Sequence, residues 1–167
     1  MRNIAFYGGG VICQLGPVSD VVLFFDCIRA FVTEQNEGTD WTLLTDALYR
    51  RYLRDTEFAL AVGLMARVKA VFQQTPAPAV DWNPTMSGDS AKSILDPCLP
   101  TLGNVYARYF DALDFCVESA RLFSEEWKIP QIIRIVVADS PAFIQDRFRG
   151  PDEYDALGPG DKPFWLR

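Results

Sequence analysis

The longest amphipathic pattern in the chain covers residues 103–127 and contains no proline or glycine after Gly103. On a helical wheel, with about 100° between successive residues, its apolar and acidic side chains separate onto opposite faces. The apolar face holds Tyr106, Tyr109, Phe110, Leu113, Cys116, Val117, Ala120, Phe123 and Trp127. The other face holds Asp111, Asp114, Glu118 and Glu125. The pattern predicts a helix of about six or seven turns that packs on one side and presents carboxylates on the other.

The remaining patterns predict a small sheet and further helices. Two short β-prone runs, 3–7 and 11–15, flank the triplet Gly8, Gly9 and Gly10 and predict a hairpin with a glycine turn. Helical spacing of apolar residues predicts helices over 18–33, 41–54 and 55–74. The run QIIRIVVA at 131–138 is the best strand signal and predicts a central strand. A short amphipathic helix is expected over 142–149, with Phe143, Ile144 and Phe148 packed and Asp146, Arg147 and Arg149 in solvent.

Two segments lack such periodicity. Residues 75–101 contain five prolines and predict a long loop, in which Trp82 either anchors the loop to the body or contacts a partner. The tail 150–167 is rich in Gly, Pro and Asp and predicts an irregular segment that docks its last aromatic residues into a groove. Together the patterns predict an α+β fold in a single domain, 1–167. It is predominantly helical, with four to five helices and a small sheet of about three strands.

Charge narrows the class of partner. The chain has 167 residues, 49% of them hydrophobic, which is enough for a core, and its formal net charge is −6. A negative surface is repelled by phosphate backbones and by anionic lipid, so direct nucleic-acid or membrane binding is disfavoured. It suits a basic protein partner. It also suits a protein that uses charge only to stay soluble.

The sequence offers little catalytic chemistry. It has no histidine, so the commonest general base and metal ligand is missing. The nucleophile candidates Cys13, Ser90 and Ser140 have no neighbouring base, and the glycine triplet lacks the pattern of a phosphate-binding loop. We therefore expect no catalytic residue, no metal site and no cofactor. Four cysteines without a CxxC pair, no signal peptide and no membrane span predict a cytoplasmic protein with free thiols.

In size, acidity and lack of catalytic motifs the chain resembles bacterial immunity proteins, including those that neutralise contact-dependent or secreted nuclease toxins. This resemblance implies that Asp111, Asp114 and Glu118 meet Lys or Arg residues around a toxin active site. Glu125 and Trp82 complete the expected partner-binding residues. Three alternatives remain. The first is an acidic face that is only solvated. The second is a ligand or enzymatic pocket under the loop, lined by Trp82, Tyr106 and Trp127. The third is a subunit of a larger assembly that docks through the final PFWLR.

Overall fold

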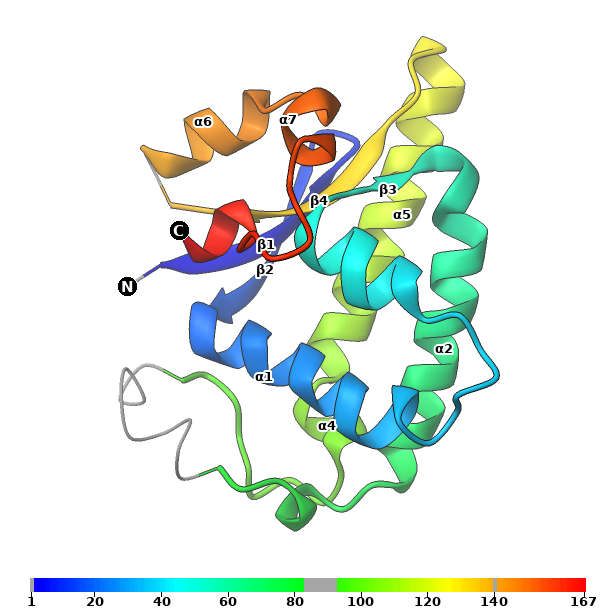
Figure 1. The fold of residues 1–167 in the computed structure, drawn as a ribbon, viewed down its shortest axis with the longest axis vertical. Coiled ribbons are helices and arrows are strands. Elements are labelled where there is room, and N and C mark those ends of the chain that lie inside the picture. Colours follow the sequence, from blue (N-terminus) through cyan, green and yellow to red (C-terminus); the bar gives the residue numbers. More distant parts are fainter. Residues whose placement is uncertain (1, 83–92, 140) are drawn as a thin grey trace.

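The computed structural model describes residues 2–82, 93–139 and 141–167. Within this part of the chain, four helices of seven or more residues combine with a four-stranded antiparallel sheet, and 57% of the structure is helical (Figure 1). The predicted α+β class is confirmed. The strand order is β2-β1-β4-β3.

The sheet has one more strand than the patterns predict. β1 (Asn3–Gly8) and β2 (Val11–Pro17) form the expected hairpin, and β4 (Ile132–Val137) pairs with β1 in the expected central position. The extra strand, β3 (Leu53–Arg54), pairs with the start of β4. The helix predicted over 41–54 is therefore too long. A π-helical segment, Leu43–Leu48, occupies its middle, and Leu53 is buried against the sheet.

Three helices pack on one face of the sheet and enclose the main core. They are α1 (Val18–Ile28), α2 (Phe58–Gln74) and α5 (Ala107–Trp127) (Figure 1). α1 continues as a π-helical turn, Arg29–Thr33, so the prediction for 18–33 is confirmed. The predicted apolar stripe of α2 is buried throughout: Phe58, Ala61, Met65, Val68 and Phe72.

The long helix predicted over 103–127 is broken near its start. A short helix, α4 (Leu102–Val105), precedes α5, and Tyr106 between them has φ −102° and ψ 13°, outside helical geometry. The Tyr106 ring is fully buried and packs against the rings of Phe24 and Phe72. The break between α4 and α5 thus coincides with the packing of the Tyr106 ring, and the residue type alone does not predict it.

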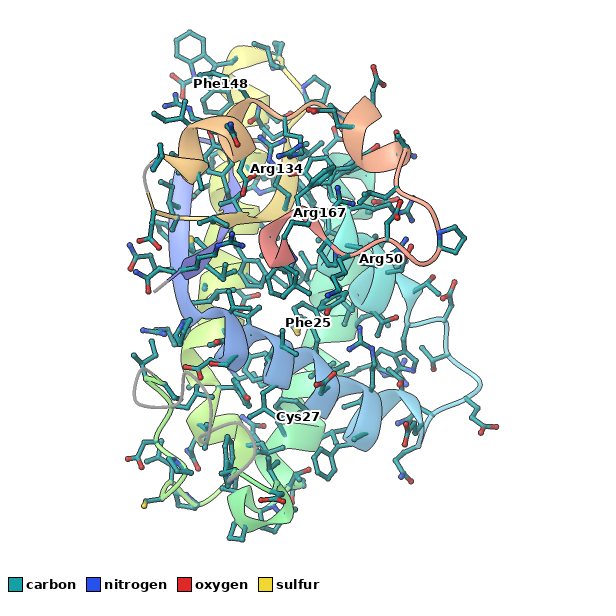
Figure 2. All side chains as sticks on the ribbon, turned by 60° about the vertical axis from the view of Figure 1, so that its left-hand side comes forward. Phe25, Cys27, Arg50, Arg134, Phe148 and Arg167 are labelled. Atoms are coloured by element: carbon teal, nitrogen blue, oxygen red, sulfur yellow. The ribbon has the colours of Figure 1, made fainter. Side chains whose placement is uncertain are left out.

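The opposite face of the sheet carries the C-terminal layer. It consists of α6 (Ala142–Phe148), α7 (Pro151–Asp155) and a 3₁₀ turn, Phe164–Leu166, so the tail is more regular than predicted. Arg134 of β4 lies beneath this layer, where it is 6% exposed and donates to the carbonyls of Arg147 and Arg149 (Figure 2). Tyr7 of β1 meets the ring of Phe143 edge-on.

The predicted packing of α6 is partly wrong. Ile144 and Phe148 are exposed, whereas Asp146 is buried. The Asp146 carboxylate accepts the Val137 N–H at 2.9 Å and an Arg149 N–H at 3.3 Å. α6 therefore turns a polar side chain toward β4, because that side chain satisfies a backbone donor on the strand.

The end of the tail docks as expected. Trp165 is 2% exposed, meets Tyr49 edge-on and donates its indole N–H to the Tyr49 carbonyl at 2.8 Å. Arg50 donates to the carbonyls of Gly158, Pro159 and Asp161 and so holds the segment that precedes Trp165 (Figure 2). None of the helices formed by the described residues is both long and apolar enough to cross a membrane.

Candidate protein-binding face

One side of α5 packs tightly and the opposite side is open to solvent. Leu113, Cys116 and Ala120 are fully buried, which confirms most of the predicted apolar face. Trp127 is the exception, because it is 59% exposed in the last turn, where α5 extends past the sheet (Figure 1). The four predicted carboxylates Asp111, Asp114, Glu118 and Glu125 are all exposed.

Two apolar side chains lie among these carboxylates. Phe115 is 60% exposed and Leu122 is 51% exposed, although both are large and hydrophobic. At about 100° per residue they fall on the same side of the helix as three of the acids. We call this surface the α5 face and define it as Asp111, Phe115, Glu118, Leu122 and Glu125.

An internal cation fixes two of the carboxylates. Arg121 donates to Glu118 at 2.7 Å and to Glu125 at 2.6 Å, and all three side chains are at least half exposed. The hydrogen bond from Arg121 lowers the pKa of Glu118. Exposed pairs of this kind add little stability. Residues 111–128 still contain five carboxylates against two cations, so the surface stays negative.

A shallow groove borders the α5 face on its α2 side. It has a volume of about 160 Å³, and Asp114 and Lys69 are the charged residues among those that line it. Burial raises the pKa of Asp114, with Lys69 opposing the rise and Asp111 adding to it. The remaining lining is apolar or small: Val62, Met65, Ala66 and Phe110.

Trp82 does not join this surface. Its indole N–H donates to the Ala77 carbonyl at 2.9 Å, and its ring packs on the core, as the anchoring interpretation predicts. Ala77 in turn bonds to Pro100 beside α4, near the N-terminal end of α5, whereas Glu125 lies in the last turns of α5. The expected partner-binding residues are thus divided. Asp111, Glu118 and Glu125 lie on the α5 face, Asp114 lines the groove beside it, and Trp82 anchors the loop.

The predicted pocket under the proline-rich loop does not assemble from its three proposed residues. Tyr106 is fully buried, and Trp127 is separated from the loop by most of α5, which at 21 residues is about 30 Å long. Trp82 is held against Ala77. Residues 83–92 of the loop, including Ser90, lie outside the described residues, as does Ser140.

Two larger hollows, of about 510 and 470 Å³, lie elsewhere, on either side of Arg51. Their arginines are engaged within the chain. Arg50 and Arg51 each donate to Asp46 at 2.8 Å, and Arg67 stacks on Trp41. A ligand anion would have to displace these carboxylate contacts, so the hollows give weaker support for a site than the α5 face does.

Sequence reasoning found the carboxylates but missed Phe115 and Leu122. The signal was present, because both residues fall inside the acidic sector of the helical wheel, where no core contact explains them. No metal-binding group of three His, Cys, Asp or Glu side chains occurs among the described residues. Comparison with protein-family models, with curated proteins and with solved structures gave no match to this chain.

Proposed function

We propose that this protein binds and occludes a basic protein partner through the α5 face. The observation that carries the proposal is the placement of exposed Phe115 and Leu122 among Asp111, Glu118 and Glu125. Interfaces are held mainly by a few apolar or aromatic anchors, and surrounding polar groups supply specificity. Isolated exposed apolar residues are common, but two that align within an acidic helix face form a candidate anchor pair.

Electrostatics supports a basic partner in particular. The formal net charge of the whole chain is −6, and the α5 segment contributes to it. Complementary charge accelerates encounter and discriminates against acidic partners. Within this proposal, the more specific role is that of an immunity protein, which would cover the basic active-site surface of a bacterial nuclease toxin.

The test is affinity capture from the native host with the tagged protein, at about 50 mM and about 300 mM salt, since screening weakens surface electrostatics. We expect one basic protein that is retained at low salt and released at high salt. The triple variant Asp111→Lys/Glu118→Lys/Glu125→Lys should lose it. The matched control Glu34→Lys/Glu37→Lys/Asp152→Lys reverses three exposed acids outside α5 and should retain it.

The immunity role needs a second readout. The captured protein is expressed alone, where it should arrest growth, and then together with the wild-type chain, which should restore growth. Phe115→Ala/Leu122→Ala should fail to restore it, whereas Leu60→Ala, an exposed leucine on α2, should succeed. If no basic protein is captured at either salt, or if the triple variant still captures it, the binding proposal is wrong.

A further inference from the structure

The α5 face repeats every seven residues. Asp111, Glu118 and Glu125 form one row at this spacing, and Phe115 and Leu122 form a second row beside it. At 1.5 Å per residue the acidic row extends for about 21 Å and the apolar pair is about 10 Å apart. Seven residues nearly complete two helical turns, so each row drifts by only about 20° per repeat around the helix.

We infer that the partner presents a basic amphipathic α-helix that lies lengthwise along the α5 face. This inference rests on the proposed function and names the element of the partner that the face recognises. A helix crossing at about 20° stays in contact with a seven-residue repeat over several turns, whereas a crossing near 50° leaves it sooner. The partner helix would place an apolar row against Phe115 and Leu122, with Lys or Arg beside the carboxylates.

The backbone of α5 argues against an extended partner segment. A peptide that binds as a β-strand gains affinity from unpaired main-chain groups at a sheet edge, and the middle of a helix has none to offer. A second copy of this chain is also a poor occupant, because two α5 faces would oppose carboxylates to carboxylates. Anionic lipid is repelled for the same reason.

Arg121 provides an internal competitor. It occupies Glu118 through two hydrogen bonds, of 2.7 and 3.1 Å, and Glu125 through one of 2.6 Å. A Lys or Arg from a partner must share these carboxylates with it. Replacing Arg121 by Gln removes this competitor and makes the surface more negative, so the inference predicts that Arg121→Gln binds a basic helix more tightly.

The probe is a synthetic, fluorescently labelled helical peptide of about 21 residues with Leu in one seven-residue row and Lys in the adjacent row. A scrambled peptide of the same composition has the same charge but no such rows. Fluorescence anisotropy at about 50 mM salt should give at least about tenfold tighter binding of the patterned peptide. Leu122→Lys should weaken that binding about tenfold, Leu60→Lys should leave it within about twofold, and Arg121→Gln should strengthen it.

Equal affinity for the two peptides, or equal effects of Leu122→Lys and Leu60→Lys, would overturn the inference. Either result would show that the α5 face recognises only the charge of the peptide. Failure of both peptides to bind would overturn it as well. Capture of a basic host protein that depends on Phe115 and Leu122 would still stand in that case, so the proposed function can survive the loss of the helix inference.

Discussion

Gly9, in the turn between β1 and β2, lies directly against Ala120 of α5. A Cβ placed on Gly9 would stand 2.5 Å from the Ala120 Cα, far closer than such atoms approach. Gly9 also has φ +57°, which favours glycine. The glycine triplet therefore serves the turn, as its sequence predicts, and also allows the hairpin to touch the helix backbone. This contact fixes the buried side of α5 opposite the α5 face.

Gly9→Ala is expected to lower the free energy of unfolding by at least about 2 kcal/mol, because it combines a left-handed backbone with overpacking. Gly63→Ala is the matched control, since Gly63 lies within α2 and an added Cβ meets no atom within 4 Å. That change should stabilise the protein by about 0.5–1 kcal/mol. Urea denaturation measures both. A Gly9→Ala protein as stable as the wild type would contradict the contact.

The last two tryptophans of the chain, Trp127 and Trp165, should respond in opposite ways to truncation to alanine. Trp165→Ala removes a buried ring and the hydrogen bond to Tyr49, so it should cost about 3–5 kcal/mol of unfolding free energy. Trp127→Ala removes a 59% exposed ring and should change stability by less than about 1 kcal/mol. If Trp165→Ala unfolds at the wild-type urea concentration, the tail is not part of the folded core.

Most of the fold that could be predicted from the sequence lies in its long periodic segments. The α2 stripe and the buried side of α5 were predictable because many residues repeat one spacing, and a single exception does not obscure it. β3 was not, because Leu53 and Arg54 are too few to show strand alternation and owe their conformation to pairing with β4. Likewise, no local pattern indicates that Asp146 is buried, because its partner is the Val137 N–H of another element.

The candidate site shows the same division. The carboxylates of α5 could be placed on one exposed face from spacing alone, whereas the separation of Trp82 from them depends on how the loop folds back onto Ala77. The exposure of Trp127 depends on how far α5 extends past the sheet, which follows from tertiary packing rather than from the helical wheel. Sequence therefore predicts which side of a helix is polar better than it predicts where its packing partner ends.

A buried carboxylate should make stability depend on pH. Asp20 in the first turn of α1 is fully buried, with one oxygen accepting the Ile94 N–H at 3.0 Å and the other without a partner among the described residues. Burial raises its pKa, and the hydrogen bond from Ile94, the nearby Ser93 hydroxyl and the charge of Arg108 only partly oppose the rise. The folded state thus holds the proton more tightly than the unfolded chain, and the contribution of Asp20 to stability is lost as pH rises through its folded pKa.

Asp20→Asn keeps an oxygen for Ile94 and removes the buried charge. We expect its melting temperature to exceed that of the wild type at pH 7, and the difference to shrink as the pH is lowered toward the raised pKa. Asp26→Asn on the same helix is the control, because Asp26 is exposed and pairs with Arg29 at the surface. Thermal unfolding of the wild type and both variants, measured from pH 7 down toward the raised pKa of Asp20, tests this expectation. A difference that grows as pH falls would mean that the Ile94 contact needs the charged carboxylate.

The four thiols should differ sharply in reactivity. Cys98 is exposed, whereas Cys13, Cys27 and Cys116 are buried. Burial raises the pKa of Cys27 to about 12, and a hydrogen bond with Cys13 together with burial raises that of Cys116. Because the thiolate is the reactive form, iodoacetamide at pH 8 should add one group to the native protein, at Cys98.

Mass spectrometry counts the adducts. One is expected on the native protein, and four are expected after unfolding in urea. Cys98→Ser should leave the native protein unlabelled over the same period. Cys13 provides the sharper test, because its hydrogen bond with Cys116 lowers its pKa while its side chain stays buried. If access controls the reaction, Cys13 remains protected with Cys27 and Cys116. Labelling of Cys13 as fast as Cys98 would show that β2 opens away from α5 in the native protein, contrary to the packing of the hairpin on Ala120.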